Sequence, residues 1–254
     1  MEDLETLLLV ACEKGNVEKV EKLLQNSQIN LNCKDKDKNR TPLDYACRCG
    51  CIDIVKLLLN DHRVDINHQN NLGATPFNVA CFFGHTEIVK LMLNNNQIDV
   101  NKSRIDGATP FWISCSKGHL EIVKLLLNDE RVEIHKVENV DYWTPFYVAC
   151  YWGRIEIVEY ILASEREINL TTQNENGKTA LDIARAGEKI ERNEDQESIE
   201  DFRRRKRTCP KIAQLLELIE INANERIKLR VQLGLASKIF DYFLFSIANV
   251  TTSF

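Results

Sequence analysis

A helix-start signal returns at a nearly fixed interval along this chain. The pair Thr-Pro begins at Thr41, Thr75, Thr109 and Thr144, in steps of 34, 34 and 35 residues (75−41, 109−75, 144−109). A threonine hydroxyl accepts a hydrogen bond from a first-turn N–H, and proline at the first helical position lacks a donor that would go unpaired there. A fixed interval of this size is typical of proteins built from stacked repeats.

Each Thr-Pro pair opens a unit of two short helices. In the stretch 75–101, TPFNVACFFGHTEIVKLMLNNNQIDVN, Gly84 is placed to end the first helix, because glycine readily adopts the left-handed conformation that closes helices. The segment after Gly84 has apolar residues at helical spacing, which predicts a second helix. Helices this short are marginal alone, so we expect neighbouring units to stack.

Two weaker copies extend the array to six units. A proline-free copy begins at Thr6, and Thr179-Ala180-Leu181 opens a degraded copy. The pattern Thr-Pro-Leu-x-x-Ala at 41–46 heads the helix-turn-helix unit of one repeat family. On these residues the sequence resembles an ankyrin-repeat protein over roughly residues 1–222.

The resemblance implies an all-α fold, an ankyrin-repeat solenoid of about six helix-turn-helix repeats with short hairpin fingers and a helical C-terminal extension. We place the repeats near residues 6–40, 41–74, 75–108, 109–143, 144–178 and 179–222, the last with an insertion at 188–207. We expect residues 223–254 to cap the open end of the stack. The alternative is an extension that docks a partner or begins a longer protein.

Two segments depart from the repeat pattern. The finger Lys136–Trp143 carries one extra residue and has Tyr142 where other fingers have glycine or asparagine. Because tyrosine disfavours positive φ, we expect a different turn there. In the insertion, acids at 200–201 precede arginines at 204–205, which predicts a short salt-bridged helix. The last repeat's second helix is then expected to start near Pro210.

Composition narrows the class of protein. The net charge of −5 gives no global reason to expect nucleic acid or an anionic membrane as partner. The acidic N-terminus lacks the basic residues of a signal peptide, and no apolar stretch is long enough to span a bilayer. Five of the nine cysteines recur in one slot of successive repeats, which favours buried, reduced thiols and a cytoplasmic or nuclear protein: Cys12, Cys47, Cys81, Cys115 and Cys150.

No pattern in the sequence marks catalysis. The run Cys47-x-Cys49-x-Cys51 lacks zinc-ligand spacing, and His85 and His119 follow helix-closing glycines, where the family often has histidine. We therefore expect no enzyme activity, no catalytic residue, no metal and no cofactor. A basic run is interpreted as a solvated helix end rather than a nuclear-import signal: Arg203, Arg204, Arg205, Lys206 and Arg207.

The resemblance implies a protein partner in a concave groove lined by the first helices and the finger tips. Residues at the corresponding positions are the candidate contacts: Arg48, Leu72, Phe82, Phe83, Asp106, Ser116, Lys117, Trp143, Tyr151 and Trp152. Half of these are aromatic, as binding hot spots often are, although packing within the repeats is the alternative. We expect no small-molecule substrate and no nucleic acid, and a monomeric chain.

The leading hypothesis is a non-enzymatic scaffold or adaptor that binds a partner through this groove. Two other functions stay open. One is a regulatory segment of a larger enzyme or channel, with 225–254 as the junction. The other is a nuclear transcriptional regulator imported through the basic run.

Overall fold

The computed structural model describes residues 3–187 and 198–221. The chain divides into two compact units, Met1–Pro145 and Phe146–Phe254. All regular structure in the described residues is helical, which confirms the predicted all-α class.

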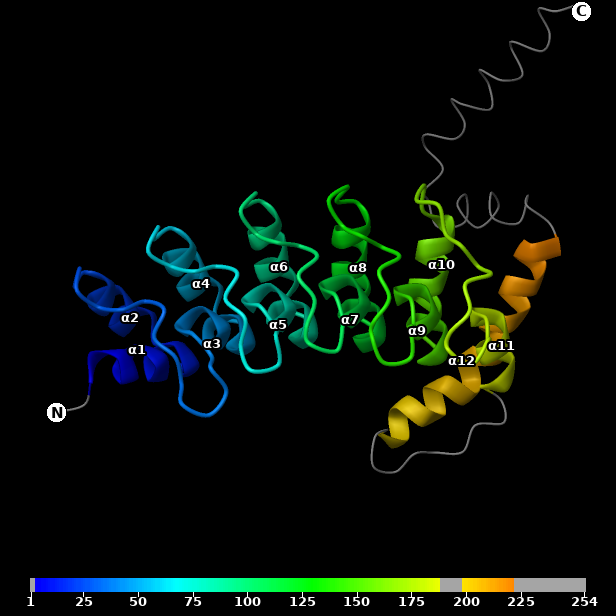
Figure 1. Ribbon diagram of the computed structural model, residues 1–254, viewed down its shortest axis with the longest axis horizontal. Coiled ribbons are helices and arrows are strands. Elements are labelled where there is room, and N and C mark those ends of the chain that lie inside the picture. The colour runs from blue at the N-terminus through cyan, green and yellow to red at the C-terminus, as the bar shows by residue number, and fades with distance from the viewer. Residues whose placement is uncertain (1–2, 188–197, 222–254) are drawn as a thin grey trace, which may run out of the picture. The chain divides into compact units, whose positions relative to one another are not determined.

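The first unit is a row of helix pairs (Figure 1). Inner helices α1, α3, α5 and α7 pack against one another in order, and each is followed by an outer helix. The bounds are α1 Leu4–Glu13, α2 Val17–Leu24, α3 Pro42–Cys49, α4 Ile52–Leu59, α5 Pro76–Phe83, α6 Thr86–Leu93, α7 Pro110–Lys117 and α8 Leu120–Leu127.

The helix-start signal acts as the sequence predicts. Thr75 precedes α5, its hydroxyl accepts a bond from the Asn78 backbone N–H at 3.2 Å, and the Asn78 side-chain oxygen Oδ1 accepts from the Thr75 N–H at 2.8 Å. Gly84 ends α5 with φ +78°. A Cβ at Gly84 would lie 2.6 Å from the His119 ring, whose Nε2 lies 3.1 Å from the Phe82 carbonyl oxygen. Both the conformation and the close approach require glycine there.

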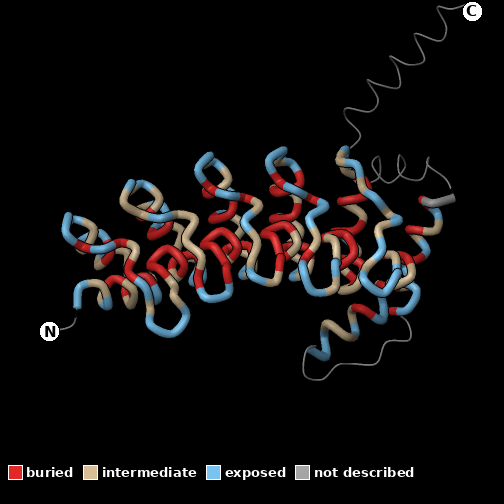
Figure 2. The backbone as a smooth tube through the Cα atoms, viewed as in Figure 1, coloured by how far each residue is buried: buried red, intermediate tan, exposed pale blue. Residues whose placement is uncertain are grey.

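The core of this unit runs along the row between inner and outer helices, where the buried residues gather in Figure 2. The predicted cysteine slots lie in it: Cys12, Cys47, Cys81 and Cys115 are each fully buried free thiols. Burial raises the pKa of the Cys81 thiol to about 12. These cysteines therefore pack as small apolar side chains.

Side-chain hydrogen bonds also connect inner helices to the fingers that follow them in the chain. The Asn78 side-chain amide donates to the Lys102 carbonyl oxygen at 3.1 Å, and Trp112 Nε1 donates to the Trp143 carbonyl oxygen at 3.0 Å. Asn78 and Trp112 occupy the same position in successive repeats (112−78=34), so this position supplies a donor to the following finger in both repeats.

The fourth finger, Lys136–Trp143, has the different turn that the sequence predicts, but not for the predicted reason. Its closing bond joins the Glu138 N–H to the Trp143 carbonyl oxygen, five residues on, whereas the two preceding fingers close over four residues, from Asn70 to Ala74 and from Arg104 to Ala108. Tyr142 has φ +58°, the same left-handed region that Gly73 and Gly107 occupy in their fingers. The extra residue is accommodated by Glu138, whose buried carboxylate accepts bonds from the N–H groups of Val140, Asp141 and Trp143 at 2.7, 2.7 and 3.1 Å. These three bonds hold the loop closed and keep Tyr142 in a conformation that its side chain disfavours.

Helix α9, Pro145–Tyr151, begins at the boundary and lies in the second unit from Phe146 on. The second unit also contains α10 Ile155–Ala163, α11 Ala180–Ala186 and α12 Ile199–Ile221. Helix α12 packs against α11 and α10. The expected start near Pro210 is wrong, because α12 is one helix that begins at Ile199 and contains Pro210. Ser198 caps it, since its hydroxyl accepts from the Asp201 N–H at 3.1 Å. Residues 199–207, assigned to the insertion, therefore belong to α12, and the expected cap or extension at 223–254 lies outside the described residues.

Candidate protein-binding surface

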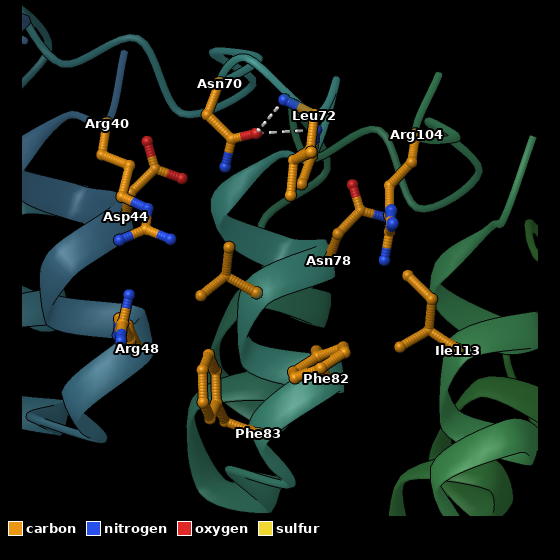
Figure 3. A pocket seen from close by; sticks show the side chains of 12 residues that line it. Arg40, Asp44, Arg48, Asn70, Leu72, Asn78, Phe82, Phe83, Arg104 and Ile113 are labelled. Atoms are coloured by element: carbon orange, nitrogen blue, oxygen red, sulfur yellow. Dashed lines mark hydrogen bonds between the residues drawn. The ribbon is translucent and has the colours of Figure 1, made fainter. Parts of the chain in front are cut away.

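A pocket of about 170 Å³ lies over α5, between α3 and α7, in the first unit (Figure 3). We call it the α5 pocket. Its apolar lining comes from the finger before α5 and from helices α5 and α7: Leu72, Ala74, Val79, Phe82, Phe83 and Ile113. Leu72 is 58% exposed and Phe83 is 43% exposed, so large apolar side chains stand open at this place.

The two phenylalanines form the lower part of the apolar surface (Figure 3). Their rings meet edge to face with centroids 5.1 Å apart. The Lys117 ammonium lies 4.3 Å from the Phe82 centroid, and the Arg48 guanidinium lies 5.7 Å from the Phe83 centroid. Cations near both rings leave the apolar surface bordered by positive charge.

Three guanidinium groups line the α5 pocket: Arg40 just before α3, Arg48 on α3, and Arg104 from the finger that follows α6 (Figure 3). Arg104 Nη2 pairs with Asp106 at 2.9 Å, and both side chains are partly exposed. A single carboxylate, Asp44, lines the same pocket. The local balance is therefore positive, in a chain whose net charge is −5.

Asp44 is a buried acid at the α3 wall of the α5 pocket. Its Oδ2 accepts bonds from the Thr41 N–H at 2.9 Å and from the Thr41 hydroxyl at 3.0 Å. Its Oδ1 is buried with no hydrogen-bond partner among the described residues. Desolvation raises the pKa of this carboxyl to about 6, against the lowering effect of the Thr41 bonds.

The structure brings four of the candidate contact residues into one pocket: Arg48, Leu72, Phe82 and Phe83. Asp106 and Lys117 lie next to the lining through the contacts given above. Ser116 is half-buried on α7. Trp143 is also half-buried, and its carbonyl accepts the Trp112 bond. The first unit thus concentrates the predicted contacts around α5.

Tyr151 and Trp152 lie in the second unit, at the end of α9. The Arg205 guanidinium of α12 lies 4.2 Å from the Tyr151 centroid and 5.3 Å from the Trp152 centroid. Arg205 is only 2% exposed, so this cation is buried over both rings. The sequence offered no sign of this contact, because it joins residues more than fifty positions apart (205−152=53).

The basic run has two kinds of members. Arg203, Lys206 and Arg207 are exposed, as a solvated helix end would be. Arg204 instead pairs with Asp201, and its Nε lies 3.5 Å from the Trp152 carbonyl oxygen. Together with buried Arg205, it is engaged within the second unit.

Sequence reasoning missed Arg104 as a member of the site. Arg104 stands 34 residues after Asn70, at the same place in the next finger (104−70). Asn70 closes its own finger by accepting bonds from the Leu72 and Ala74 N–H groups. An arginine at a position where the preceding finger has a loop-closing asparagine was the feature of the sequence that could have indicated a binding role for Arg104.

This chain is an α-helical repeat protein. Its helices come in stacked pairs, with a threonine cap at the start of successive inner helices and a buried cysteine at the same position of successive repeats. The family model described as "Ankyrin repeats (3 copies)" matches residues 2–70 and 62–138, and "Ankyrin repeats (many copies)" matches residues 132–184. The chain belongs to the ankyrin-repeat family.

One curated protein with ankyrin repeats in its name is similar to part of this chain. The chain is 44% identical over 66 residues to "Ankyrin repeat and KH domain-containing protein mask" of Drosophila melanogaster. That match covers 26% of this chain and 2% of the relative, so the similarity is confined to a short part of both. In the described ranges 3–187 and 198–221, no helix has the length and apolar character needed to cross a bilayer.

Proposed function

We propose that this chain is a non-enzymatic scaffold or adaptor that binds a partner protein through the inner-helix face around α5. Ankyrin repeats are generally protein-interaction modules, which supports the class of function. The observation that carries the proposal is the α5 pocket, where exposed Leu72 and Phe83 stand beside arginines. Such apolar surface on a soluble protein is typical of interaction sites.

The compartment and the oligomeric state belong to the same proposal. All nine cysteines are free thiols, which is typical of proteins that work in a reducing compartment such as the cytoplasm or nucleus. We propose that the chain acts there as a monomer. An open inner-helix face would then be available to the partner.

The test is affinity capture from cells with an altered α5 pocket. The double variant Leu72→Asp/Phe83→Asp places charges on two side chains that are already exposed, so folding should be preserved. Ile199→Asp is the matched control, because Ile199 is 51% exposed and lies in the second unit, outside the pocket. Circular dichroism checks that all variants fold.

We expect the double variant to lose proteins that wild type and the control both retain. If the double variant retained the same proteins as wild type, the assignment of the binding face to the α5 pocket would be refuted.

A further inference from the structure

The α5 pocket combines a space of side-chain size with an uneven charge. Its volume is about 170 Å³. A dry cavity of about 150 Å³ lined by Leu, Ile and Phe accommodates benzene. The α5 pocket therefore has room for one aromatic or branched aliphatic side chain of a partner.

The charged groups of the pocket have unused bonding capacity. Within residues 3–187 and 198–221, Arg40 and Arg48 form no ion pair, and Arg104 has a single one, to partly exposed Asp106. Guanidinium groups of this kind can pair with the carboxylates of a ligand.

We infer that the α5 pocket binds an extended acidic segment of a partner protein. One bulky apolar side chain of the segment lies against Leu72 and Phe83, and flanking Asp or Glu carboxylates pair with Arg48 and Arg104. This inference rests on the proposed function and adds the chemistry of the partner.

Charge complementarity selects this occupant over a neutral or basic one. Three arginines and a single acid line the pocket, so a basic segment would meet like charge. Arginine also binds carboxylates in a two-point geometry that fixes the direction of the segment. An acidic group and an apolar side chain together match the arginines and the exposed apolar side chains of the pocket.

The experiment selects peptides on the full-length chain from a phage-displayed library of random dodecamers. Enriched sequences are synthesised with a fluorescent label, and their binding is measured by fluorescence polarisation. We expect enrichment of a bulky apolar residue flanked by Asp or Glu, and weaker binding as salt screens the charges. Labelled oligothymidylate is the second probe, and we expect it to bind far more weakly than the acidic peptides.

The decisive variant is Arg48→Gln/Arg104→Gln, which keeps polar side chains with hydrogen-bond donors and removes two positive charges from the pocket. The matched control is Lys56→Gln/Lys90→Gln, which removes two charges from exposed positions on outer helices α4 and α6. We expect the first variant to bind the selected peptide at least about tenfold more weakly and the control to bind it as wild type does. Leu72→Ala should also weaken binding, because it removes apolar contact at an exposed position.

The inference is overturned if enriched peptides are basic or lack acids, or if they bind both charge variants equally. It is also overturned if oligothymidylate binds as tightly as the peptides and competes with them. The proposed function survives these outcomes if Leu72→Asp/Phe83→Asp still loses cellular partners, so the two failures are distinguishable.

Discussion

Replacing Asp44 with asparagine is expected to stabilise the first unit near pH 7. The Asp44 side chain is 1% exposed, and burial raises the pKa of its carboxyl from 3.8 to about 6. Below about pH 4 the carboxyl is largely neutral in both the folded and the unfolded chain, so its burial then does not lower the free energy of unfolding through desolvation of a charge. As the pH rises from about 4 to 6, the unfolded chain releases this proton first, so the free energy of unfolding falls.

The size of the effect follows from the pKa difference. A shift of about two units corresponds to a loss of about 3 kcal/mol of stability above pH 6. Asparagine keeps the acceptor for Thr41 and adds an N–H donor, which in Asn78 bonds to the next finger. We therefore expect Asp44→Asn to raise the free energy of unfolding by about 1–3 kcal/mol near pH 7, and far less near pH 4.

A matched control is present in the second unit. Asp182 makes the same capping contacts with Thr179 as Asp44 makes with Thr41. Asp182 is less buried, and the backbone N–H of Thr179 holds the pKa of its carboxyl below the ordinary value. Asp182→Asn should therefore leave stability near pH 7 unchanged or lower, the opposite sign to Asp44→Asn.

The assay is urea denaturation at a series of pH values, followed by tryptophan fluorescence. Trp112 and Trp143 report on the unit that contains Asp44, and circular dichroism follows the whole chain. A stabilisation that is equal near pH 4 and pH 7 would show that desolvation of the carboxylate is not the cause. Destabilisation by Asp44→Asn near pH 7 would refute the reasoning outright.

Two further predictions concern the fourth finger. Tyr142→Gly is expected to raise the free energy of unfolding by about 1 kcal/mol, because glycine removes the cost of positive φ at an exposed side chain; unchanged or reduced stability in urea would contradict this. Glu138→Ala leaves three N–H groups without their acceptor and is expected to cost about 2–4 kcal/mol, measured in the same way, with faster hydrogen exchange at Val140 and Asp141. Exchange rates equal to those of wild type would show that the carboxylate does not hold the loop.

The repeat architecture was predictable from sequence because its determinants are local and recur. The Thr-Pro start and the closing glycine fix each inner helix within about ten residues, so Thr75 and Gly84 give the bounds of α5 almost without error. Helix α12 was harder for the opposite reason. Pro210 resembled a helix start, whereas the cap was a single serine, Ser198, twelve residues earlier (210−198).

The candidate site was predictable only in part. Repeat register placed Arg48, Leu72, Phe82 and Phe83 on one face, and the structure shows that they share a pocket. The position of a residue within the repeat does not determine the direction in which a finger side chain points, so Arg104 was missed. Nor could it show that α12 brings a buried arginine over Tyr151 and Trp152, because that contact depends on tertiary packing.

The buried cysteines that recur at one position of the repeat give each of the first five repeats an internal chemical probe. Cys12, Cys47, Cys81, Cys115 and Cys150 are all fully shielded from solvent, and burial raises the pKa of the thiols at 12, 47, 81 and 115. An alkylating reagent reaches such a thiol only when its own repeat opens. The order in which these five sites are labelled in native buffer therefore records which repeats open first, without any engineered reporter.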